Sequence, residues 1–327
     1  MTLGGVRAVR PESSSAGGPG AVSVAIVSFN TRDHLRACLD SVLAEAPGEI
    51  VVIDNASTDG TADMVRSEYR QVTLYANTAN YGYGTAANQA VKSCQGDYVL
   101  LLNGDAMVTP GAIAALSAYM DRHPEAAVVG PLLRHPDGSL ERSYFPFPGT
   151  LAWFLENKPV VWLLRCLPLG RTRFLCLTSP TADRVVPWVL GAALLLRRTA
   201  FEAVGGFDES YFMYFEEVDL CLRLCAVQSE VHFTPSATVL HIQGASTSQC
   251  QQAMRIAHFH SYVRFYRRHY SRRRAWFWIS LRSLKIAMLL ATGLLRLRMG
   301  SDEPTRMALT QEVDAWKAVL MGPHDAA

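Results

Sequence analysis

The residues that could act on a ligand follow apolar runs in the first half of the chain. Asp54 ends the run VVID, and Asp105 follows the run DYVLLL as part of Asn103-Gly104-Asp105. A carboxylate such as Asp54 can accept a hydrogen bond from a pyrimidine N–H, or it can cap its own turn. Asp105 can hold Mg²⁺ or Mn²⁺ on a diphosphate, because hard cations prefer oxygen ligands, although Asn-Gly-Asp also favours a tight turn.

A second group of acidic residues lies in Phe215-Glu216-Glu217-Val218-Asp219. Two adjacent carboxylates raise each other's proton affinity, so one of them could serve as a general base. The alternative is structural, because acidic side chains at the start of a helix interact favourably with its dipole. His241 ends a later apolar run and could bind a metal or a phosphate, or it could be structural. Asp219 and Arg223 are expected to form a structural pair four residues apart.

Strands and helices that alternate along the chain must position these groups. We expect strands at 22–28, 50–53, 72–75, 98–102 and from 128, and helices at 32–44, after Gly60, at 85–93 and from Thr109-Pro110 to 122. This order favours an α/β fold with a mostly parallel sheet flanked by helices. Ligands bind beyond the carboxyl ends of such strands, so the polar residues there should converge on one edge.

The second half of the chain is less regular. A strand-like segment at 185–196 is interrupted at Gly191, helices are expected at 199–204 and 216–227, and strands at 231–234 and 238–241. Residues 144–187 are rich in Pro, Trp, Leu and Arg and are interpreted as a loop or insertion.

Composition excludes several classes of protein. Hydrophobic residues make up 49% of the 327 and the net charge is +2, which argues against global disorder and against an electrostatic nucleic-acid binder. The seven cysteines contain no CxxC pair, so no zinc site of that spacing is expected and reduced cytoplasmic thiols fit best. GxGxxG after the first strand and GxxxxGK[ST] are both absent, which disfavours a Rossmann dehydrogenase and a P-loop NTPase.

The two ends of the chain differ from its body. Residues 264–298 hold ten Lys/Arg and no Asp/Glu, which leaves 21 basic against 29 acidic residues elsewhere, a net of −8. The charge-free run Ile286–Leu295 is shorter than the roughly 20 residues that span a bilayer, so we expect an interfacial helix, or alternatively a core helix with a solvated basic face. Residues 1–20 lack an apolar signal segment and are expected to form a disordered tail.

Five motifs in order resemble one family. The segments VVIDNASTDGT, NxxxYGYGTAANQA, LLLNGDAMVTPGAI, WVLGAALLLRRTAFEAVGGFDESYFMYFEEVDLCLRL and HIQGAS closely resemble family 2 glycosyltransferases, most of all the bacterial rhamnosyltransferase-type branch. The resemblance implies a GT-A type fold over residues 21–250, with a nucleotide-binding half and an acceptor half. A basic, amphipathic C-terminal helical region would follow at 251–327.

The resemblance also implies an activity. An inverting enzyme would move a sugar, with rhamnose from a dTDP donor suggested, to a saccharide or lipid-linked saccharide acceptor in cell-surface polysaccharide synthesis. Glu217 would be the catalytic base, and Asp105 and His241 would hold a divalent cation, Mg²⁺ or Mn²⁺. The expected donor-binding residues are Ser28, Asn30, Asp54, Asn80, Asn88, Asn103 and Gly104. The expected acceptor-binding residues are Trp188, Gly191, Asp208 and Glu216.

Three segments depart from the family pattern. The usual Asn-Pro-Asp reads Asn103-Gly104-Asp105, which leaves metal binding to Asp105, and the usual Glu-Asp reads Glu216-Glu217, which shifts the base by one C–C bond. Tyr81-Gly82-Tyr83-Gly84 replaces the commoner G-F-A and could alter the preference for the donor sugar.

Two other functions stay open at this stage. A sugar nucleotidyltransferase would need a glycine- and lysine-rich loop after the first strand, and VSFNTRDH lacks one. A non-catalytic nucleotide-sugar-binding membrane scaffold would need no base, so the pair Glu216-Glu217 favours an enzyme. We expect a cytoplasmic protein, peripheral on the cytoplasmic face of the membrane through residues 264–298, with no nucleic-acid partner.

Overall fold

The computed structural model describes residues 7–9, 22–150, 181–242, 244, 251–298 and 310, 313, 314, 316 and 317. The chain forms two compact units, one of residues 1–209 and 216–245 and one of residues 210–215 and 246–327. The boundary between the two units follows residue 245, five residues before the boundary expected from the sequence. The short segment 210–215, just before Glu216, belongs to the second unit. The apolar part of the predicted insertion, 153–177, lies outside the described residues.

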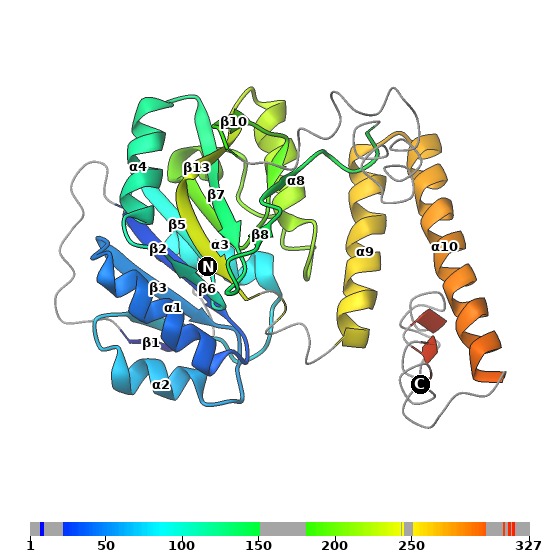
Figure 1. The fold of residues 1–327 in the computed structure, drawn as a ribbon, viewed down its shortest axis with the longest axis horizontal. Helices are drawn as coiled ribbons and strands as arrows, with labels where there is room; N and C mark the ends of the chain where they lie inside the picture. Colours follow the sequence, from blue (N-terminus) through cyan, green and yellow to red (C-terminus); the bar gives the residue numbers. More distant parts are fainter. Residues whose placement is uncertain are drawn as a thin grey trace. The chain divides into compact units, whose positions relative to one another are not determined.

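The first unit is built on a mixed sheet (Figure 1). Its strands follow the order β1-β4-β3-β2-β5-β12-β7-β13-β10, while β6 pairs with β13 and β8 pairs with β7. The strands are β1 (Arg7–Val9), β2 (Val22–Ser28), β3 (Glu49–Asp54), β4 (Thr73–Ala76), β5 (Tyr98–Asn103), β6 (Ala106–Val108), β7 (Ala126–Arg134), β8 (Leu140–Glu141), β10 (Arg184–Val185), β12 (Ala193–Arg197) and β13 (Glu230–His241). A separate pair joins β9 (Tyr144–Phe145) to β11 (Trp188–Val189).

The parallel core of this sheet is β4-β3-β2-β5, and β12 runs antiparallel between β5 and β7. β7 and β13 are parallel to each other. Alternate residues of the strands belong to two separate buried clusters, which is what a sheet covered on both faces requires. Arg7–Val9, which falls in the predicted disordered tail, pairs with β4 as an antiparallel strand.

Helices cover both faces of the sheet. One apolar cluster contains residues of α1 (Arg32–Ala44), α2 (Thr61–Glu68) and α4 (Ala112–Arg122). The other contains residues of α3 (Tyr83–Ser93), α7 (Arg198–Ala203) and α8 (Glu216–Ala226). The helices α3 and α8, which carry predicted site residues, therefore pack on the same face.

Two local predictions need correction. The helix expected to start at Thr109-Pro110 begins at Ala112, after Gly111, whose φ of 80° is left-handed and suits glycine. The two strands expected at 231–234 and 238–241 form a single strand, β13, in which a register shift between Thr234 and Thr238 absorbs the extra residues.

The second unit contains two long helices, α9 (Gln251–His269) and α10 (Arg272–Arg298). Tyr262, Phe265 and Tyr266 are buried on α9, and the Tyr262 hydroxyl donates to the Trp278 carbonyl of α10 over 3.0 Å. Ala275 and Ile286 of α10 are also buried. The two helices are thus joined along an apolar and aromatic seam.

Candidate active site

The carboxyl ends of the parallel strands bring the first predicted residues into one row. Ser28 of β2 lies opposite Asp54 of β3, and Val27 lies opposite Asn103 of β5. The buried Ser28 hydroxyl is 2.8 Å from that of Thr31, so it shapes the loop that follows β2. This edge of the sheet is the place where α/β folds bind ligands.

Asparagine side chains hold the loops around this edge. The Asn55 amide donates to Asn80 Oδ1 over 2.8 Å, and the Gly82 N–H donates to the same oxygen over 2.9 Å. Asn30 has a left-handed φ of 51°, and its Oδ1 accepts from the Thr58 N–H over 2.8 Å. Asn30 and Asn80 therefore fix the loops that frame the edge.

Asp54 is buried at the end of β3 with one free oxygen. Its Oδ2 accepts from the Ser57 N–H over 3.3 Å, whereas its Oδ1 is shielded from solvent and has no hydrogen-bond partner. Burial raises the pKa of this carboxyl, and its hydrogen bonds with Ser57 partly offset that effect. An unpaired buried acceptor is costly, so Asp54 Oδ1 is suited to receive a ligand N–H.

The neighbouring Asp59 has only a structural role here. Its carboxylate accepts from the backbone N–H groups of Arg32 and Thr61, over 2.9 and 3.1 Å. Gly60, with a φ of 83°, then starts α2. Asp59 and Gly60 thus form the turn that leads into α2.

The contacts of Gly104 explain why this loop has glycine at a position where the family usually has proline. Its N–H donates to the Val27 carbonyl over 3.2 Å, a bond that proline cannot make. A Cβ at this position would lie 3.1 Å from the Thr31 hydroxyl oxygen and 3.3 Å from the Val27 carbonyl oxygen. The close approach of these two loops therefore favours glycine, and it aligns Asn103 and Asp105 with the end of β2.

Asp105 and His241 meet where β6 pairs with β13. His241 Nε2 lies 3.6 Å from Asp105 Oδ1, and its Nδ1 lies 2.9 Å from Oε2 of Glu141 on β8. All three side chains are nearly inaccessible to solvent. Burial by itself lowers the pKa of His241, but the two carboxylates outweigh it and raise that pKa to about 9.

These residues fit a divalent cation. Ligand atoms at adjacent positions around one ion lie about 3 Å apart, close to the observed 3.6 Å between Asp105 Oδ1 and His241 Nε2. A histidine ligand typically gives its other ring nitrogen to a carboxylate, which is the contact that Glu141 makes. The buried Asn103 Oδ1 close by has no partner, so this edge also offers an unused oxygen.

Glu217 lies in the first turn of α8, facing the segment before β12. A Cβ at Gly191 would lie 3.7 Å from Glu217 Oε1, so the backbone of Gly191 passes directly over the carboxylate. Glu217 Oε2 is shielded from solvent and has no hydrogen-bond partner. Burial raises the pKa of Glu217 to about 7, which is suitable for a general base at neutral pH.

Glu216 is more deeply buried than its neighbour. Burial first, and then the charge of Glu217, raise the pKa of Glu216 well above its usual range. One of the two acids is thus kept protonated while the other can ionise, as expected for adjacent carboxylates.

Tyr83 connects the acidic pair with Asp105. Its hydroxyl donates to the Gly191 carbonyl over 3.3 Å. Burial raises the pKa of Tyr83 well above its usual range, and the charges of Glu216, Glu217 and Asp105 add to that effect. The Tyr83 hydroxyl therefore lies at the Gly191 backbone that covers Glu217.

The backbone gives a second connection. The Asn103 N–H donates to the Ala192 carbonyl over 3.0 Å, and Ala192 directly follows Gly191. The end of β5 is therefore tied to the segment that covers Glu217.

The remaining predicted acceptor residues have defined places. Trp188 stacks on Phe145, with ring centroids 4.7 Å apart, and its indole N–H donates to the Pro146 carbonyl over 3.0 Å. Asp208 follows Phe207 in the Gly205-Gly206-Phe207-Asp208 turn. Their binding roles stay predictions.

Asn88 differs from the other predicted donor-binding residues. Its Oδ1 accepts from the Phe207 N–H over 2.9 Å, and its Nδ2 donates to the Phe207 carbonyl over 3.0 Å. Both ends of the amide are thus used to hold the turn that precedes α8. The Arg223 guanidinium, paired with the buried Asp219 over 2.6 Å, donates to the Gly206 carbonyl from the other side. The structural pair predicted for Asp219 and Arg223 is confirmed.

Comparison with known proteins decides the family. Residues 23–175 match the sequence profile of Glycosyl transferase family 2, and residues 170–316 match Glycosyl transferase family group 2. The chain is 35% identical over 259 residues to the N-acetylglucosaminyl-diphospho-decaprenol L-rhamnosyltransferase of Mycobacterium tuberculosis H37Rv, covering 73% of this chain and 81% of the relative. This chain belongs to the family 2 glycosyltransferases.

Further similarities agree with that assignment. The glycosyltransferase is 27% identical over 228 residues to the rhamnosyltransferase WbbL of Escherichia coli K12, covering 67% of this chain and 83% of the relative. The predicted rhamnosyltransferase branch of the family is therefore confirmed.

Solved structures confirm the predicted fold class, an α/β GT-A type sheet flanked by helices. A mannosyltransferase from Pyrobaculum calidifontis, in complex with GDP-Man and Mn²⁺, superposes with a TM-score of 0.52 at 16% identity, over 95% of this chain and 90% of that one. GalNAc-T7 with UDP, GalNAc and Mn²⁺ gives a TM-score of 0.51 at 17% identity, over 68% of this chain and 43% of that one.

Two residues of the candidate site, Glu141 and Tyr83, were not predicted from the sequence. Glu141 lies on a two-residue strand in a stretch with no apolar periodicity, so no pattern indicated it. Tyr83 belongs to a segment that departs from the family pattern, and its aromatic hydroxyl, shortly after the third parallel strand, is the sequence feature that could have indicated it.

Proposed function

We propose that this glycosyltransferase is an inverting, cation-dependent enzyme that transfers L-rhamnose from a nucleotide-diphosphate donor to a lipid-linked saccharide. The observation that carries the proposal is the position of Glu217 beside Gly191, because the next residue, Ala192, accepts a hydrogen bond from the Asn103 N–H two residues before Asp105. It unites a candidate base and a candidate cation ligand in one site at the edge where an α/β sheet binds nucleotides.

The donor side is formed by the strand ends. The unpaired Asp54 Oδ1 would accept the N–H of the donor's base, within loops held by Asn30 and Asn80. Asp105 and His241 would hold Mg²⁺ or Mn²⁺, oriented by Glu141. When bound there, the cation would neutralise charge on the leaving diphosphate.

The acceptor side is formed around Glu217. With a pKa near neutrality, this carboxylate can remove the proton of the acceptor hydroxyl as that hydroxyl attacks the anomeric carbon from the side opposite the nucleotide. Attack from that side inverts the configuration. Glu216, which stays protonated, adds no second negative charge beside the base.

The named relatives support rhamnose and a lipid-linked acceptor. The Mycobacterium tuberculosis protein is named as a rhamnosyltransferase acting on N-acetylglucosaminyl-diphospho-decaprenol, and the Escherichia coli protein as a rhamnosyltransferase. Such an acceptor has its sugar at a membrane surface, so the enzyme would work at the cytoplasmic face.

Helix α10 is suited to contact that surface. Phe277, Leu281, Leu284, Met288 and Leu295 recur at helical spacing on one face of α10, and all are exposed, between 43% and 61%. Ala275 and Ile286 lie on the opposite face and are buried. We call the five exposed residues the apolar stripe, and Arg274 and Lys285 flank it.

The charged residues of α10 favour a position along the membrane interface over one that crosses the bilayer. By length and composition, helix residues Arg272–Leu295 are apolar enough to cross a bilayer, so the sequence argument from the ten-residue apolar run does not decide the matter. Arg282 and Lys285 lie near the middle of this window, however. Placing both at a bilayer centre would cost about 5–7 kcal/mol in total, whereas an interfacial helix keeps them hydrated.

The donor test is a thermal-shift panel of dTDP-, UDP- and GDP-sugars, each with Mn²⁺, Mg²⁺ or EDTA. A ligand that binds only the folded state raises the melting temperature. We expect dTDP-rhamnose to raise the melting temperature only when the cation is present. In a separate transfer assay, we expect rhamnose to be transferred to a polyprenyl-diphosphate-linked N-acetylglucosamine. Transfer that proceeds at full rate in EDTA would overturn the cation requirement, and a shift with another nucleotide class would overturn the donor.

The membrane test uses sedimentation with anionic vesicles. Replacing Leu284 and Met288 of the apolar stripe by Asp should release the protein from the vesicles. The control is Val227→Asp, which changes an equally exposed apolar side chain, 60% accessible, outside α10. Equal loss of vesicle binding in the control, or full retention in the stripe variant, would refute the interfacial role.

A further inference from the structure

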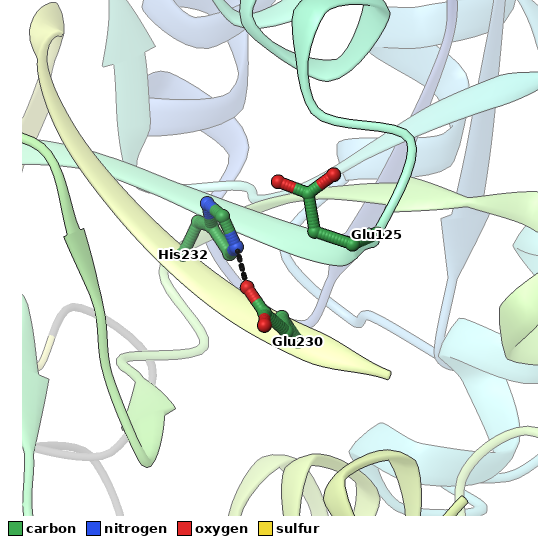
Figure 2. A group of neighbouring side chains, drawn as sticks. All are labelled: Glu125, Glu230 and His232. Atoms are coloured by element: carbon green, nitrogen blue, oxygen red, sulfur yellow. Dashed lines mark hydrogen bonds and ion pairs between the residues drawn. The ribbon is translucent and has the colours of Figure 1, made fainter. Parts of the chain in front are cut away.

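A second group of metal-ligating side chains lies at the opposite end of β13 from His241. Glu230 and His232 lie in the first three residues of β13, and Glu125 immediately precedes β7 (Figure 2). One ligand atom from each residue lies within 4.8 Å of the others. His241, in contrast, is the last residue of the twelve-residue strand. The group is therefore remote from the candidate cation ligands Asp105 and His241.

The sheet fixes the backbone of this group. β7 and β13 are parallel neighbours, with Glu230 opposite Ala126, and the Glu230 N–H donates to the Glu125 carbonyl over 3.0 Å. The positions of the Cα atoms are thus set by ladder hydrogen bonds. Only the two glutamate side chains, whose exposed fractions are 44% and 41%, have freedom to move.

His232 is oriented in the manner of a metal ligand. Its ring is buried, with Nδ1 2.9 Å from the hydroxyl of the buried Tyr119 and Nε2 2.8 Å from Glu230 Oε2. A histidine that ligates a metal through one nitrogen usually has the other fixed by a hydrogen bond of this kind. With Tyr119 accepting from Nδ1–H, the Nε2 lone pair faces the carboxylates, and a cation between them would satisfy both.

We propose that Glu125, Glu230 and His232 bind a divalent transition-metal ion of the zinc class. Ligand atoms around a tetrahedral ion lie about 3.4 Å apart, so a cluster spanning 4.8 Å needs only a small rotation of two exposed carboxylates. An imidazole with two carboxylates prefers such an ion to Mg²⁺ or Ca²⁺.

His123 lies beside Glu125, next to the three residues whose ligand atoms converge. Its Nδ1 lies 3.0 Å from Glu125 Oε1, and its ring centroid lies 5.3 Å from that of His232. The chain thus has two matching segments, His123-Pro124-Glu125 immediately before β7 and Glu230-Val231-His232 at the start of the neighbouring strand β13. A metal held by both segments would fasten the start of β13 to the start of β7, so its role is to stabilise the sheet.

The test must separate this site from the candidate cation site of the donor. Full-length protein carrying Asp105→Asn would be titrated with Zn²⁺ by calorimetry, with and without the added pair Glu125→Gln and Glu230→Gln. These glutamines keep the shape of exposed side chains and leave the buried His232 untouched. The matched control adds Glu68→Gln and Glu202→Gln instead, which change exposed carboxylates paired only with arginines.

We expect one equivalent of Zn²⁺ to bind the Asp105→Asn protein and its control variant, with the melting temperature raised by a few degrees. The Glu125→Gln/Glu230→Gln pair should weaken binding by at least tenfold and remove that rise. Binding that survives the pair unchanged, or that is absent from the Asp105→Asn protein, would overturn the proposal. Both readouts are independent of transferase activity, so they do not depend on the proposed function.

Discussion

Oε2 of Glu141 lies 2.9 Å from Nδ1 of His241, and both side chains are buried. The contact joins β8 to the end of β13 and leaves His241 Nε2 directed at Asp105. His241 thus lies between two carboxylates, one from a hairpin strand and one from the loop that follows β5. Under the proposed function, Glu141 is a positioning residue for the cation that Asp105 and His241 would hold.

Glu141→Gln should weaken Mn²⁺ binding by about 10–100-fold, because a lost partner of a metal-ligating histidine typically has that cost. The measurement is calorimetric titration with Mn²⁺ in the absence of donor. Asp137→Asn, in the exposed β7–β8 turn, is the control and should bind Mn²⁺ as the unmodified protein does. Unchanged affinity in Glu141→Gln would show that the contact only stabilises the fold.

Asp105→Ala should abolish the cation-dependent part of donor binding, since it removes the carboxylate that faces His241 Nε2. Calorimetry with the nucleotide-sugar would be run with Mn²⁺ and with EDTA. The two affinities should become equal in the variant. An unaltered difference between them would exclude Asp105 as a cation ligand.

Glu217→Gln should reduce kcat by about 10²–10⁴-fold while donor affinity is retained, because glutamine cannot accept the proton of the acceptor hydroxyl. In the unmodified enzyme, kcat/KM should rise with pH and level off above about pH 7, since the base must be ionised and its pKa is about 7. Wild-type turnover in the variant, or a rate that falls as pH rises through 7, would contradict the assignment.

The same substitution should stabilise the fold at alkaline pH. The folded pKa of Glu217, about 7, exceeds the ordinary value of 4.5, so the folded state binds more protons between these values and stability falls as pH rises through this window. Above pH 7 the full penalty, on the order of 3 kcal/mol, is present. Denaturant unfolding should therefore show Glu217→Gln to be more stable than the unmodified protein at pH 8 and equally stable near pH 4.

Asn88→Ala should lower the free energy of unfolding by about 1–3 kcal/mol, because it leaves the Phe207 N–H and carbonyl without partners. Donor affinity, measured by calorimetry, should be unchanged if the amide only holds the turn. Lys92→Ala, at an exposed position of the same helix, is the control. Lost donor affinity with unchanged stability would instead support the donor-binding role expected from the sequence.

The order of apolar runs and turn residues along the chain was sufficient to predict the alternating strands and helices and the residues at the strand ends. Short apolar runs such as Val22–Ser28 favour strands buried on both faces, and the carboxyl ends of parallel strands share an edge. The placement of Asp54 and Asp105 at this edge followed from that rule. The motif order was enough to indicate the family.

Which distant groups come into contact depends on the three-dimensional packing of the chain. Contacts such as Glu141–His241, Asn88–Phe207 and Gly191–Glu217 join segments separated by many residues, and no periodicity records them. The pKa values of Glu216 and Glu217 likewise depend on burial that the packing of α8 imposes. Short-range patterns encode local structure, whereas a site is assembled by long-range packing, which is why the sequence indicated the residues but not their partners.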